Sequence, residues 1–189
     1  MKAWEQRTFA ALKRIHGIER PVIAEIGIGR GYMSKELLRH PTLHLLMVDN
    51  WLPRGEQPQA YRDTGDFFAT LTPDHCDVLH MMARTVAKAN PGRVTIHHAD
   101  SVDAARAVCD GALDLVFLDG DHSYEGCKRD IAAWLPKVKR GGWLGGHDYL
   151  NHGDARFDFT GVARAVDEFA VNFGVTIEED LNFTYWVKR

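Results

Sequence analysis

The chain has 189 residues, enough for one domain with a sizeable hydrophobic core and short for two. Apolar residues make up 45% and charged residues 26%, as in average globular proteins, which argues against disordered, collagen-like and low-complexity classes. The formal charge is -3, and Lys and Arg (23) do not outnumber Asp and Glu (26), so no bulk attraction to nucleic acids or anionic membranes is expected. We therefore expect a small-molecule partner.

The cysteines and the N-terminus bear on the cellular compartment. Cys76, Cys109 and Cys127 are far apart and odd in number, which argues against a disulfide framework or a thiolate zinc site. The first seven residues lack the apolar core of a signal peptide, and no apolar run approaches the roughly 20 residues that span a bilayer. The sequence thus predicts a cytoplasmic protein without a membrane partner.

The first half of the chain predicts repeated units of a strand followed by a helix. An amphipathic helix is expected over residues 2–16, within an N-terminal segment 1–17 that ends at a glycine. Strands are expected over 22–26, 43–48 and 93–97, and helices over 32–39, 74–89 and 102–108. A polar insertion with Pro and Gly occupies residues 51–73.

The second half continues the pattern and fixes the fold class. Residues 113–118, which are apolar except for Asp114, form the most convincing buried strand in the chain. A helix is expected over 124–138, ended by Gly141 and Gly142, then a strand over 143–146, a helix over 161–173 and strands over 175–178 and 183–187. We predict a single α/β domain over 1–189 with a doubly wound, mostly parallel seven-stranded sheet, helices on both faces and one late antiparallel strand. The loop within 149–160 is a candidate lid.

Ligands of such sheets bind at the carboxyl ends of the strands, where this chain carries a glycine loop. Gly27, Gly29 and Gly31 allow the backbone to approach a ligand closely. Tyr32 breaks the dinucleotide pattern, and the carboxylate of Glu25 would repel a pyrophosphate. A cationic, amino-acid-bearing nucleoside fits better, which favours S-adenosylmethionine as the cofactor.

Acidic residues at the next strand ends extend this cofactor site. Asp49, followed by Asn50, is placed to accept hydrogen bonds from the ribose hydroxyls. Asp100 and Ser101 are candidates for holding the adenine amino group. The alternative is that these residues cap loops and helices, Ser101 in particular capping the helix that follows it.

Several motifs carry a family resemblance over nearly the whole chain. In order along the sequence, they are EIGIGRG, VDNW, HADS and DLVFLDG. They resemble the class I S-adenosylmethionine-dependent methyltransferases, whose fold is Rossmann-like. The later motifs DGDHSYEG, GGWLGGHDY and GVARAVDEF resemble a bacterial subfamily related to metal-dependent O-methyltransferases that act on catechols and macrolide sugars. The resemblance implies methylation of a small hydroxylated acceptor.

The resemblance also implies a divalent cation at the fourth and fifth strand ends. By position its ligands would be Asp119, His147 and Asp148, with Asp119 also close to the cofactor and the reacting atoms. His147 stands where the relatives usually have a carboxylate. Imidazole suits Mn, Fe, Zn or Ni better than Mg, which prefers oxygen ligands. The residues therefore leave open whether the cation is Mg or Mn, and whether a metal is used.

His122 is the candidate general base, because it lies three residues past Asp119, where the relatives carry a lysine or histidine base. The alternative is a loop histidine bonded to Asp121, which we expect to orient His122 or to cap the helix starting at Tyr124. Candidates for the acceptor pocket are aromatic: Trp51, Tyr149, Phe157 and Phe159.

Two other functions are compatible with the sequence. DGDH and GGHD superficially resemble the metal boxes of phosphoesterases, but a metal-dependent hydrolase needs further ligands near the first strand. A non-catalytic cofactor-binding protein is the other alternative. The amphipathic first helix is also compatible with a homodimer.

Overall fold

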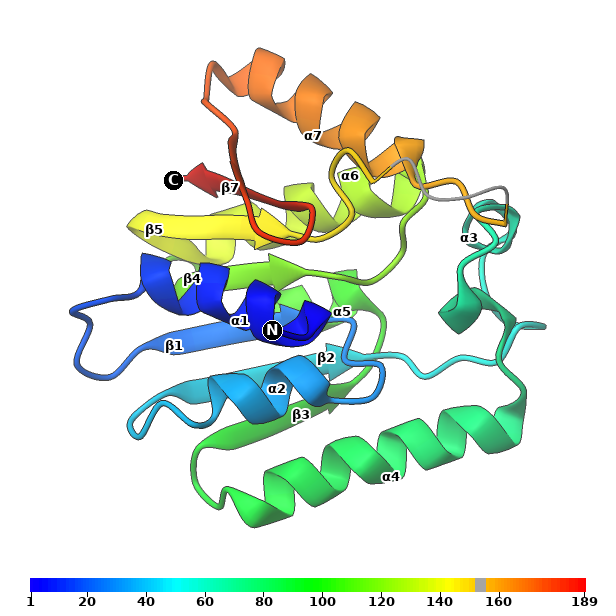
Figure 1. Ribbon diagram of the computed structural model, residues 1–189, viewed down its shortest axis with the longest axis horizontal. Helices are drawn as coiled ribbons and strands as arrows, with labels where there is room; N and C mark the ends of the chain where they lie inside the picture. The colour runs from blue at the N-terminus through cyan, green and yellow to red at the C-terminus, as the bar shows by residue number, and fades with distance from the viewer. Residues whose placement is uncertain (152–155) are drawn as a thin grey trace.

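The computed structural model describes residues 1–151 and 156–189, which form one seven-stranded sheet in the order β3-β2-β1-β4-β5-β7-β6 (Figure 1). The strands are β1 (Val22–Ile26), β2 (His44–Asp49), β3 (Val94–His98), β4 (Leu113–Leu118), β5 (Val138–Gly146), β6 (Glu178–Asp180) and β7 (Thr184–Lys188). The first five run parallel, and β7 is antiparallel to both of its neighbours. The predicted doubly wound, mostly parallel sheet with a late antiparallel strand is confirmed.

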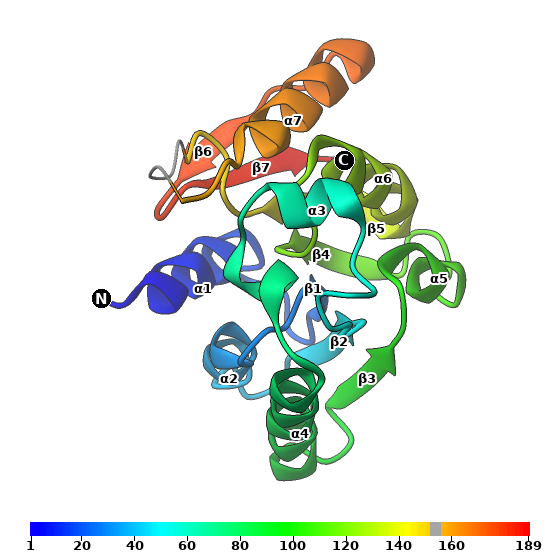
Figure 2. The ribbon, with the colours of Figure 1, turned by 90° about the vertical axis from the view of Figure 1, so that its right-hand side faces the viewer.

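Helices cover both faces of the sheet, as the edge-on view of Figure 2 shows. One face carries α1 (Ala3–Arg14), α2 (Tyr32–Leu37) and α4 (Pro73–Ala89), and the other carries α5 (Ser101–Arg106), α6 (Tyr124–Trp134) and α7 (Thr160–Phe173). The side chains of β4 alternate between the two cores: Phe117 packs with the first set and Val116 with the second. All residues of β4 are buried, and all but Asp114 are apolar. Asp114 accepts the amide of Val22 and pairs with Lys139, so its buried charge has partners.

The predicted helix over 124–138 is too long. α6 ends at Trp134, and Pro136 lies in the short 3-10 turn Leu135–Lys137 that follows. Proline has no N–H to continue an α-helix, so the chain turns and β5 begins at Val138. The pair Gly141–Gly142 therefore lies inside β5, near a shift in its register with β4, and does not end the helix as predicted.

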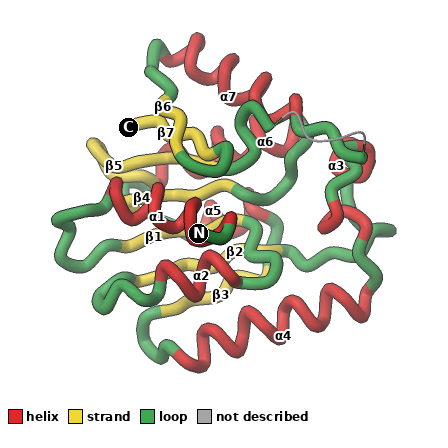
Figure 3. The backbone as a smooth tube through the Cα atoms, in the orientation of Figure 1, coloured by secondary structure: helices red, strands yellow, loops and turns green. Residues whose placement is uncertain are grey.

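Two connecting segments lie beyond the carboxyl ends of the strands. The insertion contains α3 (Gln59–Asp63) and the 3-10 helix η1 (Phe67–Thr70), and Figures 1 and 2 place α3 over this edge of the sheet. Residues 152–155 of the predicted lid over 149–160 lie outside the described part. Beyond them, the amide of Asp158 donates to the carbonyl oxygen of Thr64, 2.7 Å away. The late loop, green before α7 in Figure 3, thus packs against the insertion.

No helix among the described residues is long and apolar enough to cross a membrane.

The pairing of β5 with β7 requires a residue without a side chain at position 145. A Cβ on Gly145 would lie 2.2 Å from Cε3 of Trp186, a fully buried ring. We expect Gly145→Ala to lower the free energy of unfolding by about 1–3 kcal/mol through overpacking. Urea denaturation measures this loss. Gly55→Ala is the control, because no atom lies within 4 Å of its added Cβ, and an equal loss there would contradict the explanation.

Candidate active site

A cavity of about 510 Å³ opens at the carboxyl ends of the strands. It lies where the strand order reverses between β1 and β4, the usual ligand site of an open α/β sheet. Its volume is within the roughly 300–1,000 Å³ of small-molecule sites. The glycine loop, the first turns of α1 and the insertion all contribute to its lining.

The glycine loop is held against β4 and β2. Gly27 has a φ of 83°, and a Cβ there would lie 2.0 Å from the carbonyl oxygen of Asp119, so only glycine fits. Asp49 Oδ2 accepts hydrogen bonds from the amides of Ile28 (2.8 Å) and Gly29 (3.1 Å), and its Oδ1 accepts one from Trp51 (2.8 Å). A carboxylate oxygen has two lone pairs, so Oδ1 retains one for a ligand.

Glu25 is buried beside this loop. Its side chain is 2% exposed, and the hydroxyl of Ser34 donates to Oε2 at 2.6 Å. Burial raises the pKa of Glu25 to about 8, although the Ser34 hydrogen bond opposes the shift. A cationic group placed next to Glu25 would favour its ionised form.

The remaining cofactor candidates lie around the ends of β2 and β3. Asn50 Oδ1 accepts the amide of Leu52, and Asp100 accepts the amide of Val102 and pairs with Arg129 at 3.1 Å. The residue that caps α5 is Asp100, so the alternative cap at Ser101 is wrong. Ser101 Oγ instead accepts the indole N–H of Trp134 at 2.9 Å. All three candidates line the cavity.

Trp51 lies at the same end of the cavity as Asp49. Its ring stacks on His80, with centroids 4.4 Å apart. Its Nε1 is buried and has no hydrogen-bonding partner among the described residues. The indole N–H is therefore a donor that a bound ligand can satisfy.

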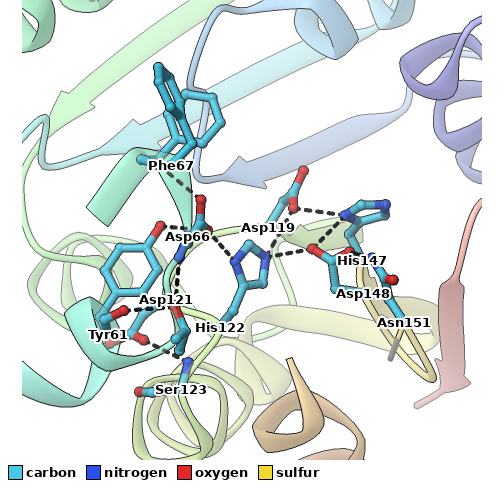
Figure 4. Close-up of polar contacts among 12 residues, drawn as sticks. Tyr61, Asp66, Phe67, Asp119, Asp121, His122, Ser123, His147, Asp148 and Asn151 are labelled. Carbon is cyan, nitrogen blue, oxygen red and sulfur yellow. Dashed lines mark hydrogen bonds and ion pairs between the residues drawn. The ribbon is translucent and has the colours of Figure 1, made fainter. Parts of the chain in front are cut away.

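The ends of β4 and β5 bring four potential metal ligands together, and Figure 4 shows their side chains converging. The nearest nitrogen and oxygen atoms of Asp119, His122, His147 and Asp148 lie within 4.8 Å of one another. His122 Nε2 is 3.4 Å from Asp119 Oδ1 and 3.1 Å from Asp148 Oδ2. His147 Nδ1 is 3.3 Å and 2.9 Å from the same two oxygens. We call these residues the Asp–His cluster.

Opposite charges shift the pKa values within the Asp–His cluster. Burial alone would lower the pKa of His122, but the carboxylates of Asp148, Asp119 and Asp66 outweigh it and raise that pKa well above 6.5. Burial likewise opposes the charge on Asp119, yet Arg7 and the two imidazoles hold its pKa well below 3.8. The carboxylates therefore favour the protonated forms of the two imidazoles beside them.

Two residues of this site were not predicted from the sequence. Asp66 Oδ2 lies 2.6 Å from His122 Nδ1 and also accepts the hydroxyl of Tyr61 at 3.0 Å. Arg7 Nη1 donates to Asp119 Oδ2 at 2.6 Å. Arg7 had a sequence signal, because it lies three residues after Trp4 on the inward face of α1. Asp66 had none, since its loop meets His122 only in the fold.

Not all of the aromatic residues predicted for the acceptor pocket line the cavity. Phe159 lines the cavity and packs on His122, with centroids 4.7 Å apart. Tyr149 and Phe157 are not among the cavity-lining residues, and the hydroxyl of Tyr149 donates to Asp167. Asp121 accepts the amide of Ser123, so the carboxylate that orients His122 is Asp66 and the expectation for Asp121 is wrong.

Comparison with known proteins identifies the family and the fold. The sequence model of a family described as a methyltransferase domain matches residues 24–149. No curated protein matches the chain. The structure of the O-methyltransferase NovP is similar, with a TM-score of 0.69 and 15% identity over 99% of this chain and 79% of that one.

Two further structures share the fold. Cofactor-bound Rv0187 from MTB has a TM-score of 0.65 and 16% identity, over 96% of this chain and 78% of that one. A SAM-dependent methyltransferase from Aquifex aeolicus has a TM-score of 0.59 and 13% identity, over 98% of this chain and 89% of that one.

The raised pKa of Glu25 predicts a pH-dependent cost of folding. The unfolded side chain ionises near 4.5 and the folded one at about 8, so stability falls as pH rises between these values. Glu25→Gln cannot ionise and its side-chain oxygen can still accept the Ser34 hydroxyl. We measure the free energy of unfolding of Glu25→Gln and of wild type by urea denaturation. We expect the variant's value minus the wild-type value to increase by on the order of 2–4 kcal/mol from pH 5 to pH 8. A difference that stays constant with pH would contradict this.

Proposed function

Because the chain belongs to the methyltransferase-domain family, we propose that it transfers the methyl group of S-adenosylmethionine to a hydroxyl oxygen of a small acceptor. The observation that carries this proposal is a single cavity that joins the glycine loop to the Asp–His cluster. When bound, S-adenosylmethionine supplies an electrophilic methyl group on a sulfonium, which is a good leaving group. The protein must hold the acceptor in line with it and accept the hydroxyl proton.

Charges at one end of the cavity match the amino-acid part of this cofactor. Glu25 offers a buried carboxylate to the ammonium and sulfonium, and cationic charge there would favour its ionised form. Arg7, which also lines the cavity, offers a guanidinium to the carboxylate while it keeps its bond to Asp119.

Polar groups at the other end match the nucleoside. Asp49 Oδ1 keeps a lone pair for a ribose hydroxyl. Trp51 offers its unpaired indole N–H, and Asp100 and Ser101 line the space assigned to adenine. An orphaned donor and acidic strand ends in one cavity support a nucleoside ligand.

His122 is the proposed base. Asp66 on Nδ1 favours the form in which Nε2 carries the lone pair, and Nε2 faces the Asp–His cluster. Neutral His122 takes the acceptor's hydroxyl proton as the C–O bond forms and the C–S bond breaks. The products are the methyl ether and S-adenosylhomocysteine, and the proton stays on His122.

The Asp–His cluster also fits a divalent cation. The separations of His147 Nδ1 from Asp148 Oδ2 (2.9 Å) and from Asp119 Oδ1 (3.3 Å) are close to the edges of about 3.3 Å that ligands form at bonds of 2.0–2.1 Å. Asp119, His147 and Asp148 would hold the ion, and the imidazole favours Mn²⁺ over Mg²⁺. A bound cation would lower the pKa of the acceptor hydroxyl.

Cofactor binding is tested first by calorimetry with S-adenosylhomocysteine and methylthioadenosine, which lacks the amino-acid carboxylate. We expect Asp49→Asn to weaken both ligands by about 10–100-fold, because both carry the ribose. Arg7→Gln should weaken S-adenosylhomocysteine by about 10-fold or more and leave methylthioadenosine unchanged. If wild type binds neither nucleoside, the proposed methyl transfer is wrong. If Arg7→Gln weakens the two ligands equally, Arg7 does not bind the amino-acid carboxylate, and the rest of the proposed cofactor site is unaffected.

The roles of His122 and His147 separate in a titration with Mn²⁺. We expect His147→Gln to lower the Mn²⁺ affinity by at least 10-fold, because it removes a ligand. His122→Gln should bind Mn²⁺ no more weakly than wild type, but should lower turnover of a catechol or glycoside acceptor about 100-fold or more. An equal loss of Mn²⁺ affinity in both variants would make His122 a ligand and not the base.

A further inference from the structure

A second, much smaller cavity lies next to the main one, and His122 and His147 line both of them. Its volume is about 10 Å³, and its lining includes Asp130 of α6, His147 after β5 and Tyr185 of β7. The three residues are distant in the sequence and meet only where the helix packs over the ends of the two strands.

Each of these three lining residues has a buried polar atom that the protein leaves without a strong partner. His147 Nε2 and Asp130 Oδ1 have no hydrogen-bonding partner among the described residues, and the Tyr185 hydroxyl has beside it only the thiol of Cys127, a weak hydrogen-bonding group. A buried polar group without a partner costs about 1–3 kcal/mol. Three such atoms around one cavity indicate a shared partner, since isolated unsatisfied groups would be scattered.

We propose that one ordered water molecule binds in this cavity and fixes the orientation of His147. A volume of about 10 Å³ is close to one water-sized probe, and buried waters bond to two to four polar groups. Water accepts a hydrogen bond from His147 Nε2–H and has hydrogens for Asp130 Oδ1 and the Tyr185 hydroxyl. Each of the three protein atoms then has a partner.

The bound water determines which nitrogen of His147 faces the ligand cluster. With Nε2–H donated to water, the lone pair of a neutral imidazole is on Nδ1, which lies 2.9 Å from Asp148 Oδ2 and 3.3 Å from Asp119 Oδ1. This is the form that a metal-ligating histidine needs, with its second nitrogen held from behind. The functional part of the inference therefore rests on the proposed metal site.

Asp130 connects the water to the cofactor end of the site. It lines both cavities, and it is hydrogen-bonded to Ser101, whose Oγ accepts the indole N–H of Trp134. The hydroxyl hydrogen of Ser101 is thus available to one Asp130 oxygen, while Oδ1 remains for the water. The water, Asp130 and Ser101 act as positioning groups behind the reacting atoms.

Tyr185→Phe tests the inference, with Tyr149→Phe as a matched control. Both variants remove the hydroxyl of a buried tyrosine, and the two rings are neighbours with centroids 5.9 Å apart. Tyr149 bonds to Asp167 and does not line the small cavity. In high-resolution crystal structures we expect water density in wild type and Tyr149→Phe, and lost or displaced density in Tyr185→Phe.

Mn²⁺ affinity, measured by calorimetry on the same proteins, provides the second readout. We expect Tyr185→Phe to bind Mn²⁺ about 10-fold more weakly than wild type, and Tyr149→Phe to bind it equally well. A wild-type cavity without water density, or equal losses of affinity in both variants, overturns the inference. Water density in a wild-type protein that binds no Mn²⁺ would support the water site and overturn its role in metal binding.

Discussion

The close approach of β1 and β4 is the constraint on which the rest of the site depends. A Cβ at Gly27 would lie 2.0 Å from the carbonyl oxygen of Asp119, so the loop after β1 can lie against the end of β4 only because residue 27 has no side chain. This contact brings Glu25 and Asp119 to the same cavity. The sheet reverses its strand order at this point, so the helices that follow β1 and β4 lie on opposite faces of the sheet.

Burial and charge are balanced differently at the two ends of this contact. The Ser34 hydrogen bond and the charge of Arg7 offset only part of the effect of burial on Glu25, and its pKa rises to about 8. Asp119 is also buried, but Arg7 and two imidazoles hold its pKa low. Glu25 would therefore be ionised more readily beside a cationic ligand, whereas Asp119 already has cationic partners within the protein. A divalent cation on Asp119, His147 and Asp148 would take over the charge of the two imidazolium protons.

The sequence predicts those parts of the fold that depend on local pattern. The run 113–118 matches β4, because a strand buried on both faces favours apolar residues, which stand at every position of β4 except Asp114. The end of α6 differs from the prediction, because the apolar periodicity continues to Val138 while Pro136 ends the helix earlier.

The strand-end residues of the site were predictable for the same reason, since parallel strands bring their carboxyl ends to one edge. The partners that set their chemistry were not. Asp66 meets His122 across 56 positions, through the packing of an insertion whose sequence gives no sign of the contact. Arg7 meets Asp119 across 112 positions, and the sequence of α1 places it on the inward face without specifying its partner. Orientation and protonation thus depend on tertiary structure, even where the reacting residues follow from a motif.

Such partners explain why so many ionisable groups are tolerated in one buried region. An isolated buried charge is strongly destabilising, whereas a charge with a partner and hydrogen bonds is not. His122 lies among Asp66, Asp119 and Asp148, and each of these contacts stabilises its protonated form. A histidine held this way gives up its proton only when a ligand or cation changes the balance. If His122 is the proposed base, its deprotonation would therefore be coupled to occupancy of the site.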